Sequence, residues 1–145
     1  MISVRRRVEI NADIEELFDY LVEPPNIRDY VGPIHRIYGV SDAVIGEGTE
    51  VTIVASFLGI RFHQHTRCKV YKRPQKFVCE SIGGRFHFEA GFTLIPTAEG
   101  TVLDGWGDAS APSLFHFAEP VLGRLVGRQA DRDLAALKRR FSGRR

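Results

Sequence analysis

The chain has 145 residues, of which 43% are hydrophobic and 26% are charged. These proportions are typical of one folded domain, and they exclude a disordered chain, a collagen-like fibre and a small disulfide scaffold. The formal net charge is +2, but Arg and Lys gather at residues 5–7 and 138–145, and the stretch between them is acidic. This distribution disfavours a nucleic-acid-binding protein. We expect a single domain over residues 1–145 with a basic tail at about 138–145.

Cys68 and Cys79 are the two cysteines, and no group of Cys and His has the spacing of a metal site. We therefore expect free thiols, no metal and no cofactor. No apolar run reaches the roughly 20 residues of a membrane span, and the first residues lack the apolar centre of a signal peptide. The expectation is a cytoplasmic protein without stable membrane insertion.

The first 30 residues predict one strand and two short helices. Apolar and charged residues alternate over residues 4–10, which is typical of a strand. Apolar residues then recur at helical spacing over residues 13–22, with Asn11 or Asp13 as the helix cap. A Pro-Pro pair ends this helix and can open a second one over residues 24–30.

Residues 34–109 alternate as strands do and are divided by four candidate hairpin turns, at residues 58–59, 72–76, 83–84 and 96–100. The turns set a register in which Arg67 lies opposite both Glu50 and Glu80, and Glu80 lies opposite His87. Opposite charges then face each other on one side of the sheet, and a slip of one residue would reverse every side chain. The other side is apolar and rich in Phe.

A long C-terminal helix is predicted from near Leu114 to Phe141, and its apolar stripe can cover the apolar side of the sheet. The predicted fold class is α+β: a curved antiparallel sheet of about seven strands wrapped around this helix, with two short helices after the first strand.

Two stretches of sequence resemble a known family. The first comprises residues 8–13, 17–21 and 25–30, and the second comprises residues 45–49, residues 70–74 and Phe92-Thr93-Leu94-Ile95-Pro96 leading to Gly100-Thr101. The resemblance is to the START-like (SRPBCC) superfamily, in its polyketide cyclase/dehydrase-like branch, which has the helix-grip fold. It extends over nearly the whole chain, but it concerns fold more than chemistry. It implies binding of a lipid, isoprenoid or polyketide-like molecule between sheet and helix, and in some members cyclisation or dehydration of a polyketide.

The predicted inward face lacks the acids and bases that catalysis needs. His63, His65 and His87 fall on the outer face, whereas Cys68 and Cys79 face inward and opposite each other. Neutral polar residues remain, and they suit the orientation of a ligand. A binding protein is therefore favoured over an enzyme.

Asp133 is an exception, because with Gln129 it lies inside the apolar stripe of the C-terminal helix. A buried carboxylate needs a partner, and Arg6, inward-facing on the first strand, is the expected one. Gly105 and Gly107 also face inward and leave space under the helix.

We predict that the chain binds a hydrophobic or amphipathic small molecule without catalysis. The predicted ligand-binding residues are Tyr30, Val31, Phe57, Phe62, Gln64, Thr66, Cys79, Ser81, Phe88, Phe92, Gly105, Phe117, Leu122, Val126 and Gln129. One alternative is a polyketide cyclase or dehydratase that uses Tyr30, His116 or Asp133. Another is an interaction module, such as a homodimer or a protein at a membrane surface, that uses the basic chain ends.

Overall fold

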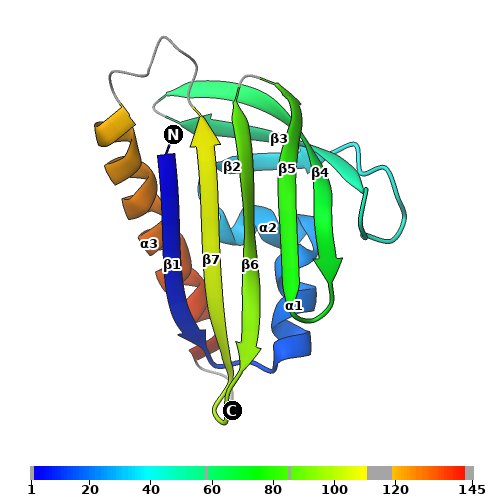
Figure 1. The fold of residues 1–145 in the computed structure, drawn as a ribbon, viewed down its shortest axis with the longest axis vertical. Coiled ribbons are helices and arrows are strands. Elements are labelled where there is room, and N and C mark those ends of the chain that lie inside the picture. Colours follow the sequence, from blue (N-terminus) through cyan, green and yellow to red (C-terminus); the bar gives the residue numbers. More distant parts are fainter. Residues whose placement is uncertain (1, 58, 85, 111–118, 143–145) are drawn as a thin grey trace.

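The computed structural model describes residues 2–57, 59–84, 86–110 and 119–142. Its elements are β1 (Ile2–Ile10), α1 (Ile14–Val22), α2 (Pro24–Tyr30), β2 (Ile34–Tyr38), β3 (Glu50–Phe57), β4 (Ile60–Lys72), β5 (Lys76–Gly84), β6 (His87–Pro96), β7 (Thr101–Ser110) and α3 (Glu119–Ser142). The strands form one antiparallel sheet in the order β1-β7-β6-β5-β4-β3-β2 (Figure 1). The predicted α+β architecture is confirmed.

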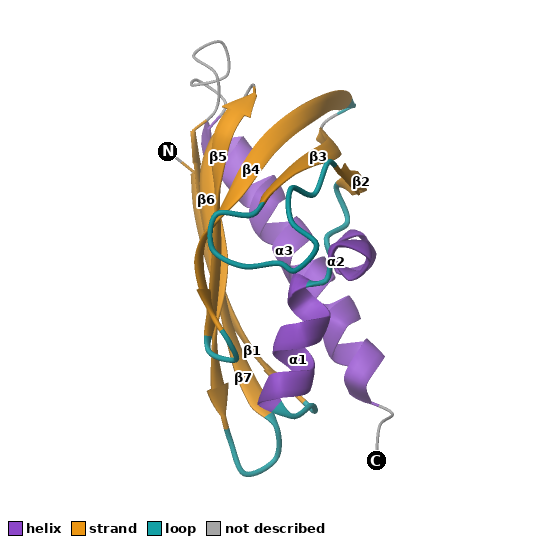
Figure 2. Ribbon diagram, turned by 90° about the vertical axis from the view of Figure 1, so that its right-hand side faces the viewer, coloured by secondary structure: helices purple, strands orange, loops and turns teal. Residues whose placement is uncertain are grey.

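All three helices lie on one side of the sheet, and α3 runs obliquely across that side (Figure 2). The sheet curls at the end formed by β4, β3 and β2, which gives it a concave face toward the helices. An antiparallel sheet with one covered face explains the alternating sequence pattern, because each strand turns apolar residues inward and polar residues outward.

Local sequence signals set the helix boundaries. Asp13 is the N-cap of α1, and its carboxylate accepts a hydrogen bond of 3.2 Å from the backbone N–H of Glu15. Pro24 occupies the first position of α2, where a missing N–H costs nothing. A break at Glu23 therefore separates two helices that pack against different parts of the sheet.

The packed core lies at the end of the concave face that α1 and the last turns of α3 cover. Leu17 and Phe18 of α1 are fully buried there, together with Ile10 of β1 and Leu137 and Phe141 of α3. Phe18 makes edge contacts with the rings of Tyr71 and Phe92, the centroids lying 5.3 and 5.9 Å apart. This end of the molecule is filled by aromatic and aliphatic side chains.

Most of the predicted strand register is confirmed. Arg67 lies opposite Glu50 on β3 and opposite Glu80 on β5. The prediction that Glu80 faces His87 is wrong, because Glu80 lies opposite Glu89. Strand β5 continues through Gly83 and Gly84, the two residues that the sequence predicts as a turn. A shift of two residues keeps every side chain on its expected face, so the alternation of the sequence cannot detect it.

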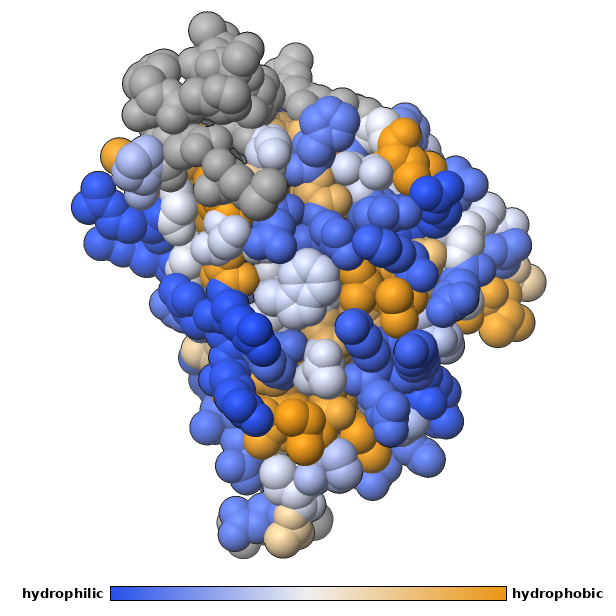
Figure 3. Space-filling model, in the orientation of Figure 1, coloured by the Kyte–Doolittle hydropathy of each residue, from blue (hydrophilic) through white to orange (hydrophobic). Residues whose placement is uncertain are grey.

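The outer face of the sheet is polar. Figure 3, in the orientation of Figure 1, shows mainly hydrophilic residues there, with hydrophobic patches interrupted by them. Lys69 pairs with Glu89 at 3.0 Å and Arg5 pairs with Asp104 at 2.7 Å. The exposed side chains of His63, His65 and His87 confirm that these histidines belong to the outer face.

Candidate ligand cavity

A cavity of about 390 Å³ lies between α3 and the strands β1, β7 and β6. Apolar side chains make up most of its wall. These are Val4, Leu21, Val31, Phe92, Leu103, Val126, Ala130, Leu134 and Leu137. Its size falls in the range of small-molecule sites, roughly 300–1,000 Å³, and so does its apolar character.

Small residues on facing elements create this space. Gly105 and Gly107 of β7 and Ala90 of β6 line the cavity from the sheet, and Ala130 lines it from α3. A methyl group added at Gly107 would lie 3.6 Å from Cβ of Ala90, an ordinary contact distance. The cavity therefore results from side chains too short to reach across from sheet to helix.

A polar pair on α3 interrupts the apolar wall. Gln129 donates a hydrogen bond of 2.9 Å from Nε2 to Oδ1 of Asp133. The backbone N–H of Gly32, in the connection between α2 and β2, donates to the same oxygen at 3.1 Å. A methyl group at Gly32 would lie 2.5 Å from Nε2 of Gln129, so a side chain there would force the end of the Gln129 side chain to move.

The expected ion pair between Arg6 and Asp133 is wrong. Arg6 faces the cavity as predicted, but its Nε donates to Oδ1 of Asp131 at 2.6 Å. Asp131 and Asp133 lie on different flanks of α3, because two residues correspond to just over half a helical turn. Among the described residues, Asp133 therefore has hydrogen-bonding partners and no ion pair, which favours a role in the site over a structural ion pair.

Burial affects two ionisable groups of the cavity wall. It raises the pKa of Asp133, and this effect is opposed by the hydrogen bonds from Gln129 and Gly32 and by the charge of Arg132. It also raises the pKa of Tyr30, whose hydroxyl donates to the backbone carbonyl of Leu21 at 2.6 Å. Asp133 is thus a carboxyl group held above its ordinary pKa, and Tyr30 already uses its proton.

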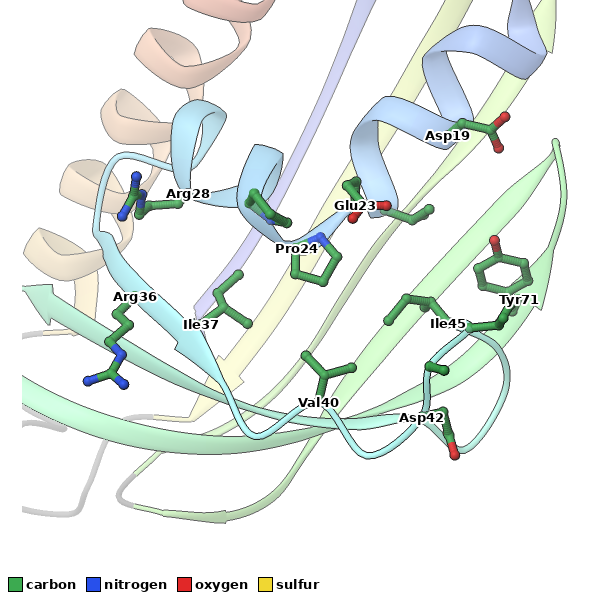
Figure 4. Close-up of a pocket in the computed structure, with 14 residues that line it drawn as sticks. Asp19, Glu23, Pro24, Arg28, Arg36, Ile37, Val40, Asp42, Ile45 and Tyr71 are labelled. Atoms are coloured by element: carbon green, nitrogen blue, oxygen red, sulfur yellow. The ribbon is translucent and has the colours of Figure 1, made fainter.

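A second hollow, of about 750 Å³, opens between α1, α2, β2 and the segment at residues 39–49 (Figure 4). Figure 4 shows Arg28 and Arg36 on one side of it and Asp19 and Asp42 on the other. Arg73 holds Asp19 through two hydrogen bonds of 2.7 and 2.8 Å. Although this hollow is the larger, five of the residues that line it are charged, and we consider the apolar cavity the better candidate.

Beneath this hollow lies a small cavity of about 40 Å³, lined by Thr66, Cys68, Phe77 and Cys79 among others. Its volume suits a water molecule or two and no larger ligand. Phe77 lines the small cavity and Phe92 lines the main one, and their rings stack with centroids 5.7 Å apart. This stack helps to separate the two spaces under the sheet.

Similarity to known proteins identifies the family of the chain. The sequence matches a family described as polyketide cyclase / dehydrase and lipid transport over residues 1–142. The chain belongs to this family. No curated protein sequence is significantly similar to it.

Solved structures share the fold of this family member at low sequence identity. TTHA0849 from Thermus thermophilus has 18% identity and a TM-score of 0.80, with 97% of each chain covered. A START superfamily protein from Mycobacterium smegmatis has 15% identity and a TM-score of 0.77, again with 97% of each chain covered. The di-domain ARO/CYC StfQ from the steffimycin biosynthetic pathway has 15% identity and a TM-score of 0.75, with 99% of this chain and 52% of StfQ covered. The START-like resemblance seen in the sequence is confirmed.

The predicted ligand-binding residues divide into three groups. Those that line the main cavity are Tyr30, Val31, Phe92, Gly105, Val126 and Gln129. Those placed elsewhere are Phe62, Gln64, Thr66, Cys79, Ser81, Phe88 and Leu122, of which Thr66 and Cys79 line the small cavity. The side chain of Phe57 and the residue Phe117 lie outside the described part of the structure, as does His116, which was predicted only for the enzyme alternative.

Two of the polar residues that do not line the main cavity, Gln64 and Ser81, form hydrogen bonds with backbone groups of the sheet. Gln64 donates to the carbonyl oxygen of Gly83 and accepts from the N–H of Phe86 at 3.3 Å. The hydroxyl of Ser81 accepts from the N–H of Phe88 at 3.0 Å. They satisfy backbone groups next to the β5–β6 turn, where the strand ladder is interrupted.

Sequence reasoning missed several wall residues, notably Val4, Ala90 and Ala130. Ala130 carried a usable signal, because a small residue in an apolar helical stripe opposite Gly105 and Gly107 indicates space. Among the described residues, no three His, Cys, Asp or Glu side chains are placed to hold a metal ion. None of the described helices is long and apolar enough to cross a membrane.

Proposed function

We propose that this family member binds one hydrophobic or amphipathic small molecule in the cavity under α3 and releases it unchanged. The observation that carries the proposal is the wall itself, which is mainly apolar and includes the hydrogen-bonded pair of Gln129 and Asp133. Burial of apolar ligand surface supplies affinity, at roughly 25 cal/mol per Å² before the costs of binding are subtracted. The polar pair supplies orientation. On the sequence evidence, we place this binding in the cytoplasm.

Native mass spectrometry of the purified protein, followed by organic extraction, tests the proposal. We expect a reproducible added mass that disappears on denaturation and yields an apolar compound. A protein that carries no added mass, and shows no thermal shift with lipid, isoprenoid and polyketide compounds, contradicts a binding role.

A matched pair of variants locates the binding. Ala130→Phe fills the cavity from α3, whereas Ala135→Phe places the same ring on the exposed side of the same helix. We expect the first variant to lower affinity at least about tenfold and the second to leave it unchanged. Equal binding by both variants would place the ligand elsewhere.

A second candidate function is dehydration of a β-hydroxyketone, and the raised pKa of Asp133 in the cavity favours it. In that reaction the carboxylate removes the proton α to the carbonyl, and the bond from carbon to the β-hydroxyl breaks. The carboxylic acid then returns the proton to the leaving hydroxyl, which departs as water. Loss of one water from such a compound with the wild type, but not with Asp133→Asn, would replace the binding proposal by this one.

A further inference from the structure

The polar groups of the main cavity differ in how far they are already occupied. Among the described residues, four side chains with charged or strongly polar groups line it: Arg6, Tyr30, Gln129 and Asp133. The indole of Trp106 belongs to the opposite face of β7 by alternation from the buried Leu103. The free hydrogen-bonding capacity of the four decides which ligand group the cavity can receive.

Two of the four have their main groups engaged by the protein. The hydroxyl proton of Tyr30 is donated to the carbonyl of Leu21. Arg6 donates to Asp131 at 2.6 Å and to the backbone carbonyl of Arg5 at 3.0 Å, so its charge is balanced at the cavity rim. Tyr30 therefore has no proton left to donate, and Arg6 keeps further N–H donors but offers no acceptor to a ligand hydroxyl.

The remaining pair offers one free acceptor and one free donor. Both protein donors to Asp133 go to Oδ1, and no described residue donates to Oδ2. Gln129 uses one N–H on Asp133, and its Oε1 accepts from Arg132 at 2.9 Å. One amide hydrogen of Gln129 and the oxygen Oδ2 of Asp133 therefore remain.

We propose that Oδ2 of Asp133 accepts a hydrogen bond from a hydroxyl group of the ligand, so that the cavity selects an alcohol or phenol with an apolar body over the matching carboxylate. This inference rests on the proposed binding function and names the chemistry of its ligand. The hydroxyl oxygen can in turn accept from the free N–H of Gln129. One donor and one acceptor on the ligand thus meet one acceptor and one donor on the protein.

Other polar groups fit less well. A ligand carboxylate would place a second negative charge beside Asp133, which is unfavourable in a site of low dielectric. An ammonium group can donate to the free lone pairs of Oδ2, but it has no acceptor for the free N–H of Gln129. The apolar remainder of the wall leaves the other N–H groups without partners, which costs binding free energy.

The test uses four fluorescent compounds that share one aromatic body: 1-pyrenemethanol, 1-methylpyrene, 1-pyrenecarboxylate and 1-pyrenemethylamine. Each is titrated into the full chain at neutral pH. We expect 1-pyrenemethanol to bind about tenfold more tightly than 1-methylpyrene, the usual order for a hydrogen bond to a charged group. We expect the carboxylate to bind most weakly and the amine to bind less tightly than the alcohol.

Asp133→Asn keeps an oxygen for Gly32 and Gln129 but replaces the free acceptor by a donor. We expect the ratio of alcohol to carboxylate affinity to fall at least about tenfold in this variant. Asp108→Asn is the matched control, because it removes an exposed carboxylate from the outer side of β7. It should leave the ratio unchanged.

The outcomes separate the two proposals. Binding of all four compounds with equal affinity, or an unchanged ratio in Asp133→Asn, overturns the hydroxyl anchor and leaves the binding function standing. Tightest binding of the carboxylate, lost in Arg6→Gln, also overturns it and makes Arg6 the anchor. Failure of every compound to bind, together with native mass spectra that show no bound molecule, overturns both.

Discussion

The concave face of the sheet has two halves that use their polar side chains in opposite ways. In the half formed by β3, β4 and β5, Gln64 and Thr66 are buried and donate hydrogen bonds to backbone carbonyls of neighbouring strands. In the half formed by β1, β7 and β6, small residues leave a cavity, and Asp133 on the facing helix keeps an unused oxygen. We call these the closed half and the open half. Polarity alone does not make a binding site, because a buried polar group serves a ligand only if the protein has not already paired it.

The largest expected effect concerns the two thiols of the closed half. Burial raises the pKa of Cys68 to about 11 and that of Cys79 to about 12. Because the thiolate is the reactive form, we expect alkylation at pH 8 to be roughly a hundredfold to a thousandfold slower than at an ordinary exposed cysteine. A third thiol introduced by Ala130→Cys, in the open half, should react at least about tenfold faster than either. Mass spectrometry of an iodoacetamide time course measures the labelling rates of all three thiols. Rapid labelling of Cys68 and Cys79 would show that the closed half does not protect its side chains.

A glutamine in each half gives the next comparison. Gln64→Ala leaves the N–H of Phe86 and the carbonyl of Gly83 without their partner in the closed half. We expect it to lower the free energy of unfolding by about 3 kcal/mol. Gln129→Ala, on the open cavity, should cost less than about 1 kcal/mol. Urea unfolding of the two variants measures the difference, and equal losses would mean that the halves do not differ in this way.

The fold was largely predictable because period-two alternation and turn residues are local properties. The pairing of Arg67 with Glu50 and Glu80 followed from them. A bulge at Lys69 contributes to this pairing. Tyr71 lies opposite Phe77 next to the turn, and the extra residue at the bulge then brings Arg67 opposite Glu80. The turn and the bulge shift the pairing of β4 with β5 by one residue in opposite directions, so the predicted pairing of Arg67 with Glu80 is kept.

The site was only partly predictable. Alternation shows that Gln64 faces inward but not that the backbone of Phe86 and Gly83 will use its amide. The same limit explains the error at Asp133, whose partner from outside α3 is the backbone N–H of Gly32. Side-chain patterns carry no information about such backbone donors, since every residue except proline has one.

Asp133 gives a smaller effect that depends on pH. Its folded-state pKa lies above the unfolded value because burial disfavours the charged form. The wild-type protein should therefore lose stability as the pH rises from the unfolded-state pKa through the folded-state pKa, and the loss persists at neutral pH. We expect Asp133→Asn to be more stable than wild type at pH 7 by less than about 1 kcal/mol, since the group is half exposed.

Thermal unfolding at pH 7 and below pH 4 checks this, with Asp108→Asn as the control. The stability advantage of Asp133→Asn should disappear at the lower pH, where the wild-type carboxyl is protonated as well. An advantage that stays constant with pH would show that charge is not its cause.

The smallest expected effect is at the rim of the open half. The Arg6 side chain is 39% exposed and that of Asp131 is 59% exposed, so their ion pair is screened by water. We expect Arg6→Gln to lower the free energy of unfolding by about 0.5 kcal/mol or less, and the difference to vanish in 1 M salt. A loss of several kcal/mol in urea unfolding would instead make this pair a structural element of the cavity.

Gly32 makes the state of the cavity readable from the backbone. Its amide donates to Oδ1 of Asp133, the carboxyl group that we propose to hold the ligand. In a nuclear magnetic resonance spectrum of isotope-labelled protein, the signal of this one amide should move whenever that carboxyl group gains a proton or a bound hydroxyl. A resonance from a residue without a side chain would then report occupancy without a fluorophore or a substitution.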